Sequence, residues 1–170
     1  MNQIWLMVWR IYDMNAIFLD VDGVLNNTKH IMKIYDLLGT KLAHRLHEWY
    51  GQTILDYKCC NLIKKLIKNT NAKVVLSSTW RLGKKDCEII EDELEQQLYG
   101  VTPFLSQIRG NEIAQYLIEH PEISNYVIID DDSDMLKEQM PHFCYVDRYI
   151  GFTKQNYNRC LEILNNEKVN

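Results

Sequence analysis

The sequence lacks the features that mark several large classes of protein. Its 3 prolines and 7 glycines do not gather into a linker, so 170 residues predict one domain with a sizeable core. Five cysteines, an odd number without a CxxC pair, argue against a disulfide framework and predict reduced thiols in a cytoplasmic protein. The apolar start, MNQIWLMVWRIYD, is too short for a membrane span and lacks the basic front of a signal peptide.

Positive charge is also scarce. The chain has 19 lysines and arginines against 23 acidic residues, a net charge of −4. Extended binding to nucleic acid or to an anionic membrane needs a basic face, so neither is expected. The composition still allows a small phosphorylated substrate or a nucleic-acid end, held by two or three local cations.

Short apolar runs alternate with longer segments of helical periodicity. The expected strands cover 15–20, 73–77, 126–130 and 143–146, and apolar helical stripes run through 59–67, 90–98, 113–117 and 157–164. Each strand is apolar throughout, which predicts a parallel sheet covered by helices on both faces. We therefore expect an α/β fold with a doubly wound, Rossmann-like sheet.

The expected domain spans residues 14–170, and residues 1–13 are interpreted as an N-terminal extension. Between the first strand and its helix, residues 26–56 predict a small cap or flap of one or two short helices. Ser133 and Thr153 stand where helix N-caps belong. For Ser133 this interpretation includes its acidic neighbours, which would open a helix continuing through Met135.

Polar side chains gather where the expected strands end: Asp20 and Asp22, Ser77 and Ser78, and Asp130 and Asp131. The carboxyl ends of parallel strands share one edge of a sheet, and ligands bind beyond that edge. Carboxylates facing one point repel unless a cation lies among them, and oxygen ligands without His or Cys select a hard ion such as Mg²⁺. The pattern therefore predicts a metal site at this edge.

The closely spaced aspartates also fit a reaction. An ionised Asp attacks phosphorus without an activating base, and a bound metal relieves its repulsion from a phosphate. A second carboxyl two residues on can protonate the leaving oxygen and later accept a proton from water. One Asp of the pair would attack and the other would handle protons.

The segment FLDVDGVL, residues 18–25, resembles hhhDxDG, the first motif of the haloacid dehalogenase superfamily in its phosphatase branch. In that family the first Asp forms an aspartyl-phosphate and the second is the general acid and base, which implies these roles for Asp20 and Asp22. VVLSS resembles the second motif, whose hydroxyl bonds the transferred phosphoryl group. The resemblance implies Ser77 for this contact, with Ser78 as the competing register.

IIDDDSDM, residues 128–135, resembles the fourth motif, whose acidic pair supports Mg²⁺. The resemblance implies Asp131 as a direct ligand beside Asp20 and the backbone carbonyl of Asp22, with Asp130 as its neighbour. A third motif supplies a cation, usually Lys, and Arg109 in IRGNEI is the candidate.

The similarity extends from Ala16 to Thr153 and is closest to small phosphatases that carry DVDGVLN, SSxWR, RGxEI and DDxSDM. These include phosphatase domains of RNA-repair proteins and resemble polynucleotide 3′-phosphatases, which implies a nucleotide or a nucleic-acid 3′-phosphate as substrate. Arg81 occupies the place of a substrate-holding Arg in those relatives, and a structural salt bridge is the equal alternative. Two residues depart from the common pattern: Val24 replaces a Thr, and Arg109 replaces the Lys.

Three other functions fit parts of this pattern. A phospho-acceptor signalling module also binds Mg²⁺ at strand ends, but its acceptor Asp follows a later strand, where this chain has Ser77. A catalytically silent binding protein and a phosphomutase are the other two. Trp80 is expected to pack in the core, and His44 and His47 are expected to be solvated.

Overall fold

The structure is a computed structural model that describes residues 14–49, 55–105 and 108–166. The expected N-terminal extension, residues 1–13, lies outside the described residues. Within the described ranges, no helix has both the length and the hydropathy needed to cross a membrane.

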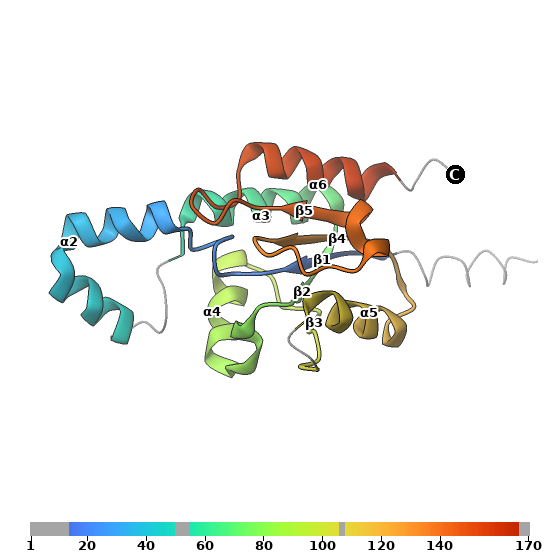
Figure 1. Cartoon of the computed structure of the whole chain (residues 1–170), viewed down its shortest axis with the longest axis horizontal. Coiled ribbons are helices and arrows are strands. Elements are labelled where there is room, and N and C mark those ends of the chain that lie inside the picture. The colour runs from blue at the N-terminus through green and yellow to red at the C-terminus, as the bar shows by residue number, and fades with distance from the viewer. Residues whose placement is uncertain (1–13, 50–54, 106–107, 167–170) are drawn as a thin grey trace, which may run out of the picture.

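A five-stranded parallel sheet forms the centre of the molecule, in the order β3-β2-β1-β4-β5 (Figure 1). The strands are β1 (Met14–Leu19), β2 (Lys73–Leu76), β3 (Gly100–Val101), β4 (Ile123–Asp130) and β5 (Phe143–Tyr145). Leu19 pairs with Leu76 on one side and with Ile129 on the other. The residues that follow these three positions therefore lie side by side at one edge of the sheet.

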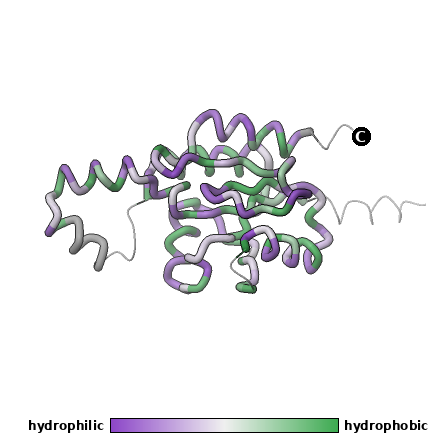
Figure 2. Tube along the Cα trace, viewed as in Figure 1, coloured by the Kyte–Doolittle hydropathy of each residue, from purple (hydrophilic) through white to green (hydrophobic). Residues whose placement is uncertain are grey.

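Helices cover both faces of the sheet, as the uninterrupted apolar strands predict. On one face lie α3 (Tyr57–Thr70), α4 (Lys84–Leu94) and α6 (Lys154–Asn166), and on the other lies α5 (Arg109–Glu119). Successive β1 side chains alternate between the two faces: Ile17 and Leu19 pack under the three helices, and Ala16 and Phe18 pack under α5. Along the outer helices, hydrophilic residues alternate with hydrophobic ones (Figure 2). The doubly wound α/β prediction is confirmed.

Between β1 and α3, helix α2 (Thr28–Trp49) projects away from the sheet (Figure 1). Gly39, at φ 71° and ψ 156°, interrupts its helical backbone and divides it into two helical segments. Residues with a side chain rarely adopt a positive φ, so glycine suits this break in the helix. The predicted insertion of short helices falls on this segment, and its role as a cap stays a prediction.

One local prediction was wrong, and one strand was missed. No helix begins at Ser133: residues 131–136 are irregular, and the 3-10 helix η2 (Lys137–His142) follows them. The backbone carbonyl of Asp134 accepts a hydrogen bond from the Gly110 N–H at 3.2 Å, and its carboxylate accepts one from the Arg109 N–H at 2.8 Å. These bonds attach the segment to α5, so it does not form a helix. The two-residue strand β3 was missed, because it is too short for a periodic signal.

Helix α6 begins as expected. The Thr153 hydroxyl accepts a hydrogen bond from the Asn156 N–H at 3.3 Å, and the Asn156 side chain accepts one from the Thr153 N–H at 3.0 Å. This reciprocal pairing satisfies backbone donors at the start of the helix.

Candidate active site

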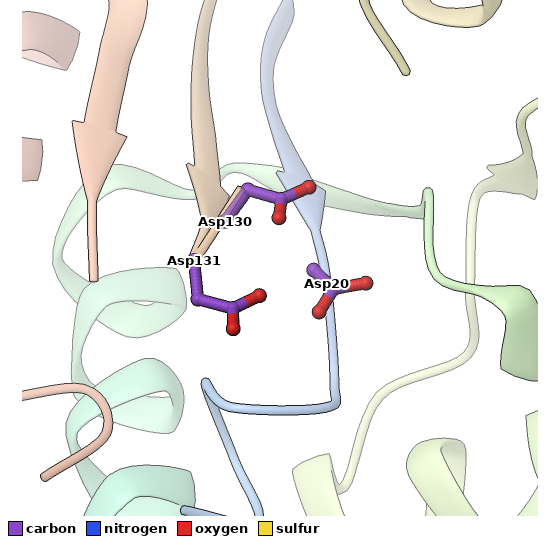
Figure 3. Close-up of side chains that lie close together, drawn as sticks. All are labelled: Asp20, Asp130 and Asp131. Atoms are coloured by element: carbon purple, nitrogen blue, oxygen red, sulfur yellow. The ribbon is translucent and has the colours of Figure 1, made fainter. Parts of the chain in front are cut away.

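Three carboxylates meet beyond the ends of β1 and β4. Oxygens of Asp20, Asp130 and Asp131 all lie within 4.8 Å of one another, and Figure 3 shows the side chains of Asp130 and Asp131 directed toward Asp20. Asp20 is 5 % exposed and Asp130 is 1 % exposed. The sequence placed these residues at neighbouring strand ends, and the structure brings them together.

Gly23 permits this close approach. Its φ is 81°, and a Cβ there would lie 2.4 Å from Asp131 Oδ2 and 3.0 Å from the Arg148 Cβ. Any side chain would therefore collide with the acidic cluster as well as strain the backbone. The glycine of the DxDG segment is required by the contact between the turn after β1 and the end of β4.

Arg109, the first residue of α5, supplies a cation to this cluster. Its Nη1 lies 3.1 Å from Asp20 Oδ1 and 3.7 Å from Asp130 Oδ2, and it also donates to the Ser77 carbonyl. The structure thus brings the predicted third-motif residue to the predicted nucleophile. A second arginine, Arg148, was missed in the sequence: its Nε lies 2.8 Å from Asp131 Oδ2 while 74 % of its side chain is exposed.

Burial raises the pKa of Asp20. The Arg109 guanidinium lowers this pKa, and the charges of Asp131 and Asp22 raise it further. Burial and then the Asp20 charge raise the pKa of Asp130, again opposed by Arg109. The Arg109 charge therefore offsets only part of the cost of burying these two carboxylates. Asp130 Oδ2 is also buried and has no hydrogen-bond partner in the described part of the chain.

The donor set fits Mg²⁺. It consists of carboxylate oxygens without histidine or cysteine, which suits a hard divalent cation. Asp20 and Asp131 would hold the ion, and Asp130 lies directly beside both. The Asp22 carboxylate is not part of this group, and the role of its backbone carbonyl as a ligand stays a prediction.

The Asp22 carboxylate is instead held by two donors. Asn26 Nδ2 donates to Oδ1 at 2.7 Å, and Trp80 Nε1 donates to Oδ2 at 3.1 Å. Trp80 was expected only to pack, and it is indeed buried, but its indole N–H also fixes the predicted acid and base. A buried indole needs an acceptor for its N–H, and the sequence shows that need without naming the partner.

Ser77 and Ser78, after β2, are both fully buried. The Ser78 side chain hydrogen-bonds Asp20 and lowers that carboxyl's pKa, whereas the Ser77 hydroxyl has no partner among the described residues. Ser78 also accepts from the Trp80 N–H at 3.5 Å, at the start of the 3-10 helix η1 (Thr79–Leu82). Ser78 is thus the serine that interacts with the predicted nucleophile, and which of the two serines would bind the phosphoryl group stays a prediction.

Arg81 adopts the salt-bridge alternative. Its Nη2 lies 2.7 Å from Glu112 Oε2, and both side chains are 3 % exposed. Its Nη1 donates to the carbonyls of Ser77 and Ser78 at 2.7 and 2.8 Å. The Nη1 and Nη2 donors are directed at protein groups, so Arg81 braces the segment after β2. Its contact with substrate stays a prediction.

The metal interpretation predicts a pH-dependent effect of Mg²⁺ on stability. Because burial raises the pKa of Asp20 and Asp130, the metal-free folded state binds more protons than the unfolded state, and its stability falls as pH rises from about 4 through the raised values. Bound Mg²⁺ offsets this repulsion, so its stabilising effect grows over the same window. Thermal unfolding at about pH 5.5 and about pH 8 should show a larger Mg²⁺-minus-EDTA shift at the higher pH.

The Asp130→Asn variant is the matched test of that prediction. It removes one buried carboxylate, so the metal-free variant should lose less stability than the wild type as pH rises. Equal Mg²⁺ shifts at both pH values in the wild type would contradict a metal at these carboxylates.

A central β1 followed by DxDG, a neighbouring β2 followed by two serines, and an acidic pair at the end of β4 on the other side of β1 are typical of a haloacid dehalogenase-type domain. The model of one family, described as the HAD domain in Swiss Army Knife RNA repair proteins, matches residues 16–157. The chain belongs to this family. No curated protein and no solved structure matches it.

Proposed function

We propose that the protein is a cytoplasmic, Mg²⁺-dependent phosphatase that hydrolyses a phosphate monoester through an aspartyl-phosphate on Asp20. The observation that carries the proposal is the buried Asp20 carboxylate, which lies between two acidic neighbours and the Arg109 guanidinium. A carboxylate in this position can approach phosphorus while cationic groups hold the phosphate oxygens. The name of the family supports a nucleotide or a nucleic-acid 3′-phosphate as substrate.

The residues of the site divide the reaction into two steps. An Asp20 oxygen forms a bond to phosphorus as the ester P–O bond breaks, and protonated Asp22 gives its proton to the leaving oxygen. Asp22 then takes a proton from water, whose oxygen attacks the phosphorus and releases phosphate and free Asp20. Bound Mg²⁺ would supply charge that offsets the repulsion between carboxylate and phosphate. Arg109 and Ser78 lie beside Asp20, where they can donate to phosphoryl oxygens.

A screen for phosphate release tests the proposal. With Mg²⁺, the wild-type chain should release phosphate from p-nitrophenyl phosphate and from at least one of three physiological classes: 3′-phosphorylated oligonucleotides, mononucleotides and sugar phosphates. Chelation by EDTA should stop the reaction. Absence of turnover on every class would contradict phosphatase function, and a single round of labelling without turnover would indicate a phospho-acceptor module.

The hydrogen bond from Trp80 predicts a dependence on the leaving group. Trp80→Phe keeps most of the buried ring but removes the N–H that fixes Asp22. Proton donation by Asp22 matters most for an alkyl ester, whose leaving oxygen is strongly basic, and least for p-nitrophenyl phosphate. We expect kcat/KM to fall about tenfold for an alkyl phosphate, the effect of losing one hydrogen bond to a charged group, and much less for the aryl ester.

A purely structural role for Trp80 gives a different result, because a distorted site would slow both esters equally. Equal losses on the two substrates would therefore contradict the positioning of Asp22 by Trp80. The Asn26→Ala variant removes the other donor to Asp22 and should show the same difference between the two esters.

A further inference from the structure

Three exposed apolar side chains stand close together in the chain between β3 and α5. Phe104, Leu105 and Ile108 are 57 %, 56 % and 45 % exposed. Single exposed apolar residues are ordinary, but a group of them beside a candidate site often marks a ligand-binding surface. We call these three residues the apolar ledge.

The ledge follows β3 at the same edge of the sheet as the acidic cluster. Val101 ends β3 and pairs with Leu76, the last residue of β2. The Thr102 N–H continues this pairing with a hydrogen bond of 3.0 Å to the Leu76 carbonyl. Because the strands are parallel, the chain beyond Thr102 leaves the sheet on the side where the two serines follow β2.

A series of contacts connects the ledge to the predicted nucleophile. The centre of the Phe104 ring lies 5.7 Å from Arg81 Cζ. Arg81 Nη1 donates to the Ser77 carbonyl at 2.7 Å. Arg109 donates to the same carbonyl, and its Nη1 lies 3.1 Å from Asp20 Oδ1. Two guanidinium groups on one carbonyl thus lie between the Phe104 ring and Asp20, and the last residue of the ledge directly precedes Arg109 in the chain.

Buried groups hold the backbone of the ledge in place. The Leu105 N–H donates to Glu112 Oε1 at 3.1 Å, and Glu112 is buried. The Pro103 carbonyl accepts from Arg81 Nη2 at 3.5 Å, and the Phe104 ring lies over the same guanidinium. A ring that the protein already holds loses little freedom when a flat ligand stacks on it, so the ligand binds more tightly.

The size and position of the ledge favour a nucleobase over a protein partner. A stable protein interface covers roughly 800 Å² on each partner, far more than three side chains provide. An exposed aromatic ring stacks on a nucleobase of any kind. The net charge of −4 leaves little basic surface to hold the backbone of a nucleotide chain, so a base contact would add affinity that electrostatics does not supply.

We propose that the apolar ledge binds the base of the nucleotide whose 3′-phosphate lies at Asp20, with this base stacked on the exposed ring of Phe104. The placement of the phosphate rests on the proposed phosphatase function, whereas the affinity of the ledge for a base does not. The ledge selects nucleotides and nucleic-acid ends over sugar phosphates, which carry the same phosphate group but no base.

The kinetic test compares a substrate with a base and one without. Phe104→Ala should lower kcat/KM about tenfold for adenosine 3′-phosphate, the effect of losing one stacked base. Glycerol 2-phosphate is also the ester of a secondary alcohol but has no base, so its kcat/KM should change less than about twofold, a factor below that of one stacked base. Phe104→Tyr keeps the ring and should restore hydrolysis of the nucleotide.

A second pair of variants tests the apolar neighbour of the ring. Leu105→Ala should also lower kcat/KM for the nucleotide more than for glycerol 2-phosphate. Ile118→Ala is the matched control, because Ile118 is a 73 % exposed apolar residue at the far end of the helix that begins at Arg109. It should leave both substrates unchanged.

A fluorescence measurement separates stacking from a structural role of Phe104. A 2-aminopurine nucleoside 3′-phosphate loses fluorescence when its base stacks, and the Asp20→Asn variant should bind it without turnover. The fluorescence loss should disappear when Phe104→Ala is added to this variant and should persist with Phe104→Tyr.

Two results would overturn the base site: equal losses of kcat/KM on the two esters in Phe104→Ala, or fluorescence that does not depend on Phe104. If the wild type hydrolyses neither ester, the proposed function fails separately. The fluorescence measurement then decides about the ledge by itself, because it requires binding and no reaction.

Discussion

The Asp20→Asn variant should lose Mg²⁺-dependent phosphatase activity by about 10⁴-fold or more, because the amide has the shape of the carboxylate but is not a nucleophile toward phosphorus. The loss should appear in kcat with p-nitrophenyl phosphate as well as with a nucleotide ester. The measurement is phosphate release at saturating substrate, together with acid quenching of a reaction with ³²P-labelled substrate. The wild type should retain label on the protein, and the variant should not.

Unfolding does not account for this expected loss. Burial raises the pKa of Asp20, so a neutral side chain relieves an unfavourable buried charge in the metal-free protein. The thermal midpoint of the variant in EDTA should therefore equal or exceed that of the wild type near neutral pH. Asp92→Asn, an exposed change on α4, is the control with full activity. Undiminished turnover in Asp20→Asn would show that another group attacks the phosphate.

The sheet was predictable because its strands carry the signal locally. The chain from Ala16 to Leu19 is apolar at every position, and both faces of β1 are buried in the structure. The acidic cluster was predictable from the same strands, since Asp20 and Asp130 follow or end neighbouring parallel strands. The resemblance to a known family then assigned roles that strand ends alone do not distinguish.

The contacts that orient the site could not be predicted, because they join segments that are distant in the chain. Trp80 and Asp22 are brought together only by the pairing of β2 with β1. Arg148 reaches Asp131 only because β5 lies next to β4. The sequence of the acidic segment after β4 predicted the start of a helix. The hydrogen bond between Asp134 and the first residue of α5 holds this segment in an irregular conformation instead.

Arg81 and Arg109 show most directly why the roles of the site residues could not all be predicted from the sequence. Both are arginines that the family resemblance placed near the phosphate, and their local sequences do not separate their roles. In the structure both donate to the carbonyl of Ser77, so the segment after β2 is held from two directions. Only Arg109 also contacts Asp20, while Arg81 meets the buried carboxylate of Glu112. The difference depends on which partner the fold places opposite each guanidinium.

The position of Ser78 therefore depends on a carboxylate that does not contact the acidic cluster. Glu112 Oε2 holds Arg81 at 2.7 Å, and Oε1 accepts from the Leu105 N–H at 3.1 Å. Burial lowers the pKa of Arg81 and the Glu112 charge opposes this, so the carboxylate compensates the charge of the buried guanidinium. Glu112→Gln preserves the shape of the side chain but removes its charge and replaces one of its two acceptor oxygens by an NH2 group. The free energy of unfolding should fall by about 3 kcal/mol, as when one partner of a buried ion pair is lost.

Urea unfolding measures this loss as a lower midpoint at an unchanged slope. Glu88→Gln is the matched control, because Glu88 forms an exposed pair with Lys84 at 3.7 Å on α4 and the same substitution there should cost about 0.5 kcal/mol or less. If Arg81 bound substrate instead of bracing the fold, Glu112→Gln would raise KM while leaving stability close to that of the control. A midpoint shift as small as that of Glu88→Gln would therefore support a role of Arg81 in substrate binding. A large shift would show that Arg81 stabilises the segment that holds Ser78 close to Asp20.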